Sequence, residues 1–238
     1  MKNIWTIASR ELRAFFVSPV PYVVSALFLI FMGYLFSIIL ITSQEASLRS
    51  TFSNMMFILL LLAPAFTMRL LAEELRLGTI ELLLTAPVRD WQVVIGKYLG
   101  SLITFALLMV APTVYYALIL KFIGNPDLIP LLSGYFGVLL FGGMFLAVGL
   151  FTSSVTQNQV IAYFAGFVIL LLLFLADPAQ SIAGSGPIGG LLNYISMQKH
   201  YDGFFRGVID SIDLVYALSV IAVALILSTF SLQARRIS

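Results

Sequence analysis

Long apolar stretches separated by short polar segments make up most of the chain. Six of them approach the roughly 20 residues that an α-helix needs to cross the hydrocarbon core of a bilayer. They cover residues 22–42, 52–71, 94–120, 131–151, 160–176 and 214–232. Because a lipid-exposed backbone must satisfy its hydrogen bonds within its own segment, each stretch is expected to be a helix. The pattern predicts a single all-α transmembrane domain over residues 1–238.

Prolines and one short polar segment modify these predicted helices. Pro64 and Pro112 fall inside the second and third stretches. Each removes a backbone donor, so both predict kinks. Residues 152–159, TSSVTQNQ, separate the fourth and fifth stretches and carry no charge. They predict a tight turn between antiparallel helices.

Composition places the chain in the membrane and excludes several classes of protein. Hydrophobic residues make up 61% and charged residues 10%, and the mean hydropathy is +1.04. Soluble domains average roughly 45–50% apolar and about 25% charged residues. A net charge of +2 is too small to indicate a nucleic-acid-binding protein. The absence of cysteine excludes a disulfide framework, thiolate catalysis and a metal site built from cysteine.

Basic residues are divided unevenly between the two ends of the predicted helices. If the N-terminus is cytoplasmic, nine of them lie on the cytoplasmic side and four lie outside. The first set is Lys2, Arg10, Arg13, Arg69, Arg76, Arg89, Lys97, Arg235 and Arg236, and the second is Arg49, Lys121, Lys199 and Arg206. Lysine and arginine favour the cytoplasmic side. Six spans therefore place both termini in the cytoplasm.

Residues 1–18 precede the first apolar stretch and combine a basic face with an aromatic, apolar face. Trp5, Arg10 and Arg13 are expected to anchor this segment as a helix in the membrane surface. The alternative is a frayed lead-in to the first span. The sequence Ser-Pro-Val-Pro at residues 18–21 is expected to end the helix and turn the chain into the bilayer. A cleavable signal is not expected here.

The polar island at residues 69–97 holds 8 of the 24 Lys, Arg, Asp and Glu residues of the chain. Gly78 predicts a helix break within it, because glycine costs about 1 kcal/mol relative to alanine inside a helix. Thr79 is expected to cap a new helix of about two turns, and Pro87 is expected to end it.

The new helix carries Glu81 in its first turn, where the helix dipole favours an acidic residue. Leu82, Leu83 and Leu84 point in successive directions around its axis. One side can therefore rest on the membrane domain while another presents apolar surface, as partner sites do. A hairpin that only connects the second and third spans is the alternative. On these physical grounds both interpretations stay open.

The chain after the proline is expected to return to the membrane as a helix. Asp90 is in position to cap that helix, and Trp91 and Lys97 are expected to anchor it at the membrane interface. Residues 72–93 then form a cytoplasmic element of their own.

Two motifs carry a resemblance to a known family. The run RxxxEExxxGTIELLLTAPV at residues 69–88, followed by Gly-Lys at residues 96–97, resembles the signature between the second and third helices of type 2 ATP-binding cassette (ABC) exporter permeases. The run SxxxHxxxFxxGVIDxxD at residues 196–213 resembles the branch that includes gliding-motility permeases and permeases of multicopper-enzyme maturation. The surface helix and the six spans match the family layout.

The resemblance implies a mechanism and partners. Residues 78–87 would be a coupling helix seated in a groove of a separate cytoplasmic ATPase, with Glu73, Glu74 and Glu81 as its polar contacts. Two permease copies, identical or similar, would pair with two ATPases that bind ATP and Mg²⁺. The family further implies export across a bacterial inner membrane, contact with membrane lipid and, as an open question, an additional membrane or extracytoplasmic subunit.

The residues themselves disfavour other activities. No phosphate-binding GxxxxGK[ST] motif occurs, so ATP hydrolysis must belong to another polypeptide. Residues 131–176 carry no charge, which argues against a proton relay. The lone histidine, His200, has no partners for a hydrolase site or a metal site. A weak ion site with nearby aspartates is the minor alternative to ordinary hydrogen bonding. The chain is not expected to be an enzyme or to bind a cofactor or metal.

The segment at residues 177–213 is too apolar for a solvated loop and is expected to form short, partly re-entrant external helices. The resemblance implies an external gate here, and a hydrophobic lid that fixes helix ends is the alternative. The gate candidates are His200, Phe204, Gly207, Asp210 and Asp213.

Small residues predict close helix packing. Gly96 and Gly100 form a GxxxG pair, and Ser133 and several glycines line the fourth span. Packing within the chain is favoured over a dimer seam.

Three functions remain at this point. The chain is expected to be an export permease subunit; the alternatives are a mechanotransmitter that passes ATP-driven motion to an external partner, and a structural membrane anchor. The sequence does not identify a substrate.

Overall fold

The computed structural model describes residues 2–43, 46–79, 88–124, 126–184 and 186–237. Its elements, in chain order, are α1 (Lys2–Val17), α2 (Pro19–Ser43), α3 (Arg49–Thr67), α4 (Ala72–Leu77), α6 (Asp90–Phe105), the π-helical turn η1 (Ala106–Val110), α7 (Ala111–Ile123), α8 (Leu128–Val155), α9 (Gln159–Ala183), α10 (Pro187–Ile195), α11 (Met197–Phe205) and α12 (Ser211–Ile237). The described chain contains helices and no strand, which confirms the all-α prediction.

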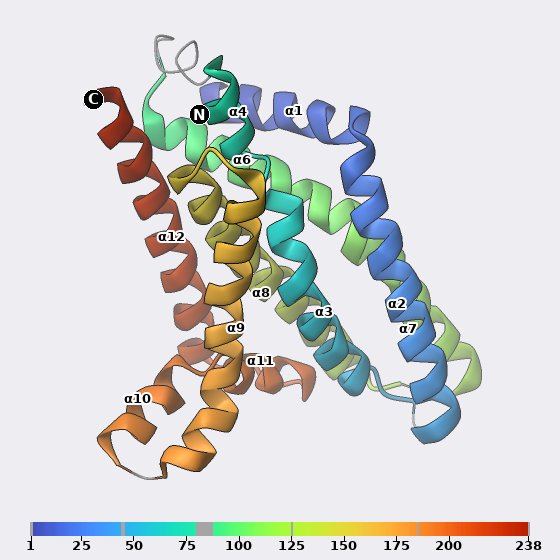
Figure 1. The fold of residues 1–238 in the computed structure, drawn as a ribbon. Helices are drawn as coiled ribbons and strands as arrows, with labels where there is room; N and C mark the ends of the chain where they lie inside the picture. The colour runs from blue at the N-terminus through green and yellow to red at the C-terminus, as the bar shows by residue number, and fades with distance from the viewer. Residues whose placement is uncertain (1, 44–45, 80–87, 125, 185, 238) are drawn as a thin grey trace.

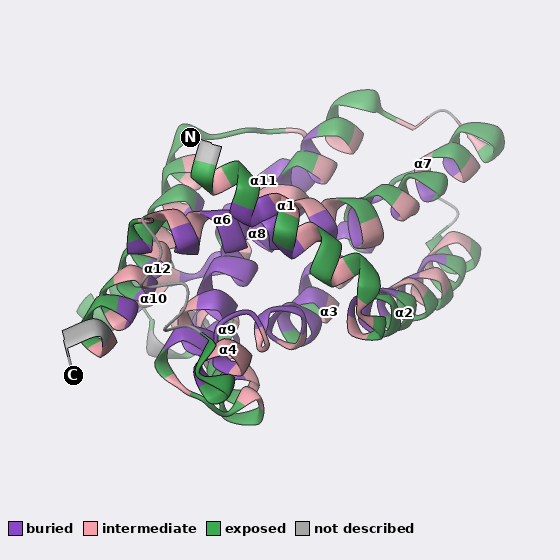
Figure 2. Cartoon of the chain, turned by 90° about the horizontal axis from the view of Figure 1, so that it is seen from above, coloured by how far each residue is buried: buried purple, intermediate pink, exposed green. Residues whose placement is uncertain are grey.

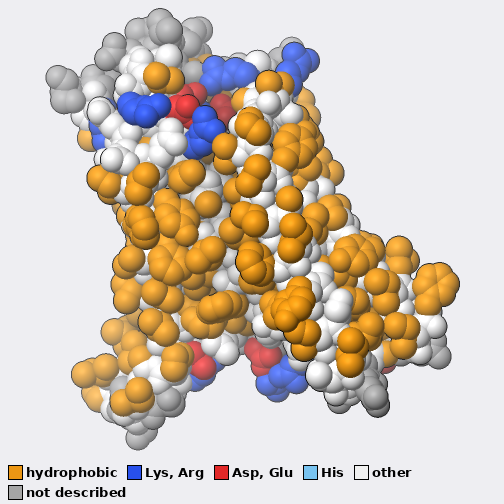
Figure 3. Space-filling view, turned by 45° about the vertical axis from the view of Figure 1, so that its right-hand side comes forward, with side chains coloured by type: hydrophobic (Ala, Val, Ile, Leu, Met, Phe, Trp, Pro, Cys, Tyr) orange, Lys and Arg blue, Asp and Glu red, His pale blue; other side chains and the backbone are white. Residues whose placement is uncertain are grey.

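Six helical segments of the described chain are long and apolar enough to cross a membrane. They are Pro19–Ser43, Arg49–Leu77, Asp90–Ile123, Leu128–Val155, Gln159–Gln180 and Ser211–Arg235. The six predicted spans are therefore confirmed. An apolar surface band lies between two ends at which charged side chains gather (Figure 3), as a spanning protein requires.

The two ends of the bundle carry different elements (Figure 1). α1 lies across one end, close to α4 and to both chain termini, whereas α10 and α11 lie at the other end. This arrangement agrees with an even number of spans. The end that holds α1 and α4 is the one predicted to face the cytoplasm.

The core is built around α8 and α3. In the most apolar part of α8, 78% of the residues are buried, against 17% in α12 at the periphery. Figure 2 shows buried positions concentrated on α8, α3 and α6. A Cβ atom at Gly134 of α8 would lie 2.1 Å from the ring of Phe52, and one at Gly142 would lie 2.5 Å from Phe105. These glycines of the fourth span pack within the chain, as predicted.

The prolines have different effects. Pro112 follows the π-helical turn η1, which accommodates its missing N–H and its ring within the third span. Pro64 lies inside α3, which continues to Thr67. A short turn then leads to α4, which begins at Ala72.

Two predicted boundaries shift. The turn predicted at residues 152–159 shortens to residues 156–158, because α8 continues to Val155. The side chain of Asn158 begins the next helix by accepting from the N–H groups of Val160 and Ile161. α9 runs through Pro178 to Ala183, beyond the predicted end of the fifth span.

Candidate functional site

The connection from α3 to α4, inside the second span, is a tight turn held by a serine of another helix. Ser153 of α8 donates from Oγ to the carbonyl oxygen of Met68 at 3.0 Å and accepts from the N–H groups of Leu71 and Ala72, each at 3.0 Å. The turn thereby satisfies backbone groups that a helix start leaves without intrahelical partners. α4 is a separate short helix in a fixed position on α8.

Gly78 ends α4, as the sequence predicts. Its φ is +69° and its ψ is 3°, a left-handed conformation that glycine adopts without a Cβ clash. Thr79 Oγ1 donates to the carbonyl oxygen of Glu74 at 3.5 Å. The remaining predicted coupling residues, Glu81, Leu82, Leu83, Leu84 and Pro87, lie outside the described residues.

The return into the membrane begins at α6. Gln92, rather than Asp90, supplies the side-chain cap, since its Oε1 accepts from the N–H of Arg89 at 3.1 Å. Asp90 is buried as the first residue of the helix, and Trp91 is exposed. Gln92 can act in this way because it lies three residues after Arg89 and reaches back to it.

Lys97 is buried, with an exposed fraction of 1%, although the sequence predicts an interfacial anchor. Its Nζ atom lies 2.8 Å from Oε1 of Glu11 on α1 and 2.9 Å from Oε1 of Glu74 on α4. We call Glu11, Glu74 and Lys97 the α1–α4–α6 junction. A lysine removed from water needs such partners, because an unpaired buried charge is costly. The junction therefore fixes these three helices to one another.

The GxxxG pair of α6 makes the junction possible. A Cβ atom at Gly96 would lie 2.7 Å from Cβ of Ile7, and one at Gly100 would lie 2.8 Å from Cβ of Glu11. The two glycines thus let α1 pack directly on α6, so that the carboxylate of Glu11 reaches Lys97. This packing lies within one chain, as the sequence analysis favours.

A second layer of charge surrounds the junction. Nη2 of Arg10 lies 3.3 Å from Oε1 of Glu74 and 3.4 Å from Oε1 of Glu11. Arg69 forms a bidentate pair with Glu73, at 2.8 and 3.0 Å. Oε2 of Glu74 is buried and has no hydrogen-bond partner among the described residues. An unmade bond of this kind costs about 1–3 kcal/mol.

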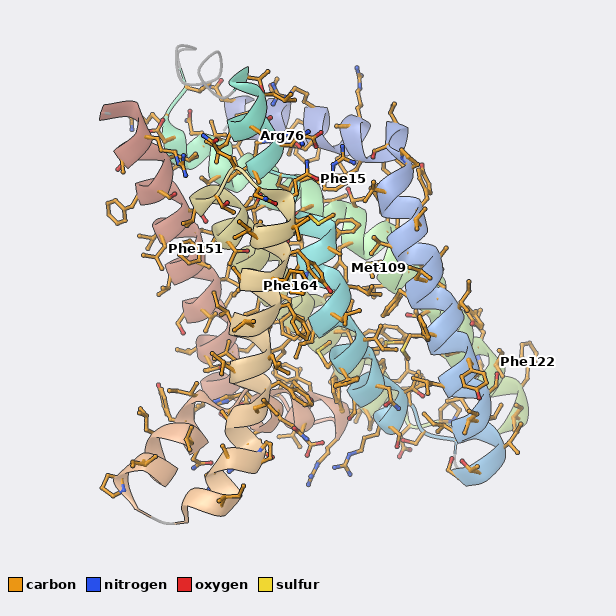
Figure 4. The ribbon with its side chains drawn as sticks, viewed as in Figure 1. Phe15, Arg76, Met109, Phe122, Phe151 and Phe164 are labelled. Atoms are coloured by element: carbon orange, nitrogen blue, oxygen red, sulfur yellow. The ribbon has the colours of Figure 1, made fainter. Side chains whose placement is uncertain are left out.

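The predicted anchors of the first helix are placed as expected for a surface helix. Trp5 and Arg13 are exposed, and Arg10 is half-exposed beside the junction. The side chain of Phe15 points from α1 toward the bundle (Figure 4), and its ring stacks on Phe66 of α3 with the centroids 5.0 Å apart. α1 is thus attached to the bundle by both charge and aromatic packing.

Of the five gate candidates, three make packed contacts between helices and two lie in the chain that connects α11 to α12. Nδ1 of His200 lies 2.7 Å from Oδ1 of Asp213, and its ring stacks on Tyr216 with centroids 4.0 Å apart. Phe204 is buried, and its carbonyl oxygen accepts from Ser133 Oγ of α8 at 2.6 Å. These contacts hold α11 between α8 and the beginning of α12.

Gly207 and Asp210 shape the chain between those helices. Gly207 has a φ of +88° beside Pro130, and Oδ1 of Asp210 accepts from the N–H of Ile212 at 3.1 Å. Asp202 pairs instead with Arg49 and Arg206. Asp202 and Asp210 therefore do not join Asp213 at His200, and no group of three or more potential metal ligands occurs among the described residues.

Sequence reasoning missed two residues of the site. The pattern of residues 1–18 predicts a surface helix but no role for Glu11, and that of residues 152–159 predicts a turn but no role for Ser153. A signal for Glu11 exists, since Glu11 lies on the same α1 face as Ile7 and Ala8, four and three residues earlier. No local signal identifies Ser153, because its partners lie more than 80 residues away.

The comparison with known families agrees with this architecture. A family model described as "ABC-2 family transporter protein" matches residues 5–236, which is nearly the whole chain. No curated protein matches the chain. The family match covers all six spans, the junction and the external helices.

Proposed function

Because the chain belongs to the ABC-2 family of transporter proteins, whose membrane subunits work with a cytoplasmic ABC ATPase, we propose that its residues 72–93 transmit ATP-driven motion for export. The chain supplies the membrane half of such a machine, and the ATPase binds ATP and Mg²⁺. A second permease copy completes the membrane domain. The cytoplasmic end is the one that carries α1, α4 and both termini (Figure 1).

The observation that carries the proposal is the bond from the buried Lys97 of α6 to the partly buried Glu74 of α4. These two helices lie on either side of residues 80–87, the segment expected to contact the ATPase. A displacement of that segment reaches both helices together, since separating them removes one partner of a buried ammonium group. Glu11 extends the same connection to α1.

Motion then passes along two routes into the membrane. α4 leads into α3 of the second span through the turn held by Ser153, and α6 leads into the π-helical turn of the third span. Such turns often lie at functional sites of helices. At the other end, α11 packs on α8 through Phe204 and serves as the external gate.

The test is a charge reversal in the segment that contacts the ATPase. The partner ATPase is co-purified with the permease, and its activity is measured in lipid nanodiscs with and without the permease. Glu81→Lys is expected to abolish the effect of the permease on ATPase activity while all six spans insert. Asp127→Lys, at the exposed opposite end, is the matched control and is expected to leave that effect intact.

The result also separates the other functions. Unchanged coupling in the Glu81→Lys variant overturns the docking assignment and leaves a structural anchor. Stimulation of the wild-type complex by a solute or lipid supports export. Stimulation only by an external protein identifies a mechanotransmitter instead.

A further inference from the structure

A cavity of about 520 Å³ lies between α1, the beginning of α2 and the connection from α3 to α4. Its volume falls within the roughly 300–1,000 Å³ that is typical of ligand sites. Charged side chains, among them Arg10, Arg69 and Glu74, line one part of it. Phe15 and Phe66 belong to its apolar part. The lining is therefore amphipathic.

The cavity lies where a bilayer changes from headgroups to acyl chains. α1 crosses the end of the spans, and the first turn of α2 contributes Val20 and Pro21 to the wall (Figure 1). Phe16 and Val17 at the end of α1 are exposed and apolar, as in a helix that rests on lipid. A lipid of the adjacent leaflet can therefore reach the cavity without leaving the membrane.

The charges of the cavity specify what kind of headgroup fits. Its cationic side chains are Arg10, Arg69 and Lys97, and its anionic side chains are Glu11, Glu73 and Glu74, so their formal charges cancel. Because the lining has no net charge, a ligand with a net charge gains no net electrostatic attraction from it. The guanidinium groups of Arg10 and Arg69 remain partly exposed and retain donors for an anionic group.

The carboxylates of Glu73 and Glu74 add a second requirement. Both side chains are partly exposed and line the cavity beside the two guanidinium groups. A ligand that bonds to them must present an N–H or O–H group near its phosphate. Primary ammonium groups meet this requirement best, because charge-assisted hydrogen bonds to a carboxylate are the strong ones.

We propose that this cavity binds one aminophospholipid of the adjacent leaflet, with an ethanolamine headgroup. Its ammonium group donates to the carboxylates of Glu73 and Glu74, its phosphate lies between Arg10 and Arg69, and its acyl chains leave along Phe15 and Phe66. The bound lipid joins α1 to the α4 arm beside the junction. This site stands independently of the proposed coupling to an ATPase.

The first experiment measures headgroup preference. The full-length chain is purified in mild detergent and exposed to ethanolamine, choline and glycerol phospholipids with identical acyl chains, and bound lipid is counted by native mass spectrometry. The choline lipid has the same phosphate and the same net charge as the ethanolamine lipid but no N–H donor. The glycerol lipid has a net negative charge. We expect about a tenfold preference for ethanolamine over choline, the effect of one charge-assisted hydrogen bond.

The second experiment locates the preference. Ala14→Trp places a large side chain in the cavity while Glu11, Glu74 and Lys97 keep their identities, and is expected to remove the ethanolamine preference. Val17→Trp, on the exposed part of the same helix, is the matched control and is expected to retain it. Equal retention of ethanolamine and choline lipids, stronger retention of the glycerol lipid, or an unchanged preference in Ala14→Trp each overturns the proposal.

Discussion

Nζ of Lys97 lies 2.9 Å from Oε1 of Glu74, and this partly buried bond joins the two helices that flank residues 80–87. The same ammonium group lies 2.8 Å from Oε1 of Glu11 on α1. One cation therefore connects α1, α4 and the start of α6. The cluster is neutral when Arg10 is included, so its members are costly to remove singly.

Lys97→Met is expected to destabilise the protein by about 1–3 kcal/mol, because buried Glu11 and partly buried Glu74 lose the ammonium group and keep only half-exposed Arg10 as a cationic partner. The free energy of unfolding is measured by titration with a denaturing detergent. Arg76→Met, on the exposed side of α4, serves as the control and is expected to change stability little.

A triple variant distinguishes charge from packing. Lys97→Met combined with Glu11→Gln and Glu74→Gln removes both carboxylates and is expected to regain much of the lost stability. If the triple variant is as unstable as Lys97→Met alone, the loss comes from packing, and the ionic explanation of the junction is wrong.

Gly100→Ala is expected to push α1 away from α6, since the new Cβ atom would lie 2.8 Å from Cβ of Glu11 and 3.1 Å from the carbonyl oxygen of Ala8. Overpacking of this kind costs about 1–3 kcal/mol. Hydrogen exchange of residues 2–17 reports the detachment. Gly190→Ala, a helical site with open space around it, is the control, and equal exchange in both variants would contradict the packing role.

The six spans and the break at Gly78 could be predicted because their signals are local. An apolar run of about 20 residues predicts a span on its own, and a glycine after Arg-Leu predicts the end of a short helix. The turn after Thr67 could not be predicted in the same way, since it depends on Ser153 from another helix. The nearby Pro64 lies inside α3 and does not mark this turn.

The role of Lys97 could not be predicted either. Hydropathy places this residue near the membrane interface, where lysine ordinarily extends toward water. The close approach of α1, which Gly96 and Gly100 permit, covers the side chain and replaces water with Glu11 and Glu74. Contacts between residues 86 positions apart leave no periodic pattern in one sequence.

Ser153→Ala is expected to lower stability by about 1–3 kcal/mol, because the N–H groups of Leu71 and Ala72 lose their buried acceptor. Ser154→Ala is a closely matched control. Ser154 is equally buried, but its hydroxyl donates only to the carbonyl oxygen of Phe151 within its own helix. Thermal unfolding of the two variants is compared, and equal shifts would show that the turn does not depend on Ser153.

Asp213→Ala is expected to loosen α11 from α12, because it removes the carboxylate oxygen that lies 2.7 Å from Nδ1 of His200. The expected result is faster hydrogen exchange in residues 197–205. Asp210→Asn is the control, since asparagine can still accept from the N–H of Ile212 at the helix start. Faster exchange in both variants would assign the effect to the helix start instead of the His200 pair.

Gly78→Ala is expected to reduce the effect of the permease on its ATPase severalfold while the bundle remains folded. Nothing lies within 4 Å of the added Cβ atom, so the change acts only through the backbone, whose φ of +69° costs alanine about 1 kcal/mol or more. That cost favours continuation of α4 as a right-handed helix and redirects residues 80–87. Gly78→Asn is expected to retain more coupling, because asparagine tolerates the left-handed conformation. Gly186→Ala, at a φ of −72°, is the control. A loss of coupling in Gly78→Asn equal to that in Gly78→Ala would contradict a conformational role for this residue.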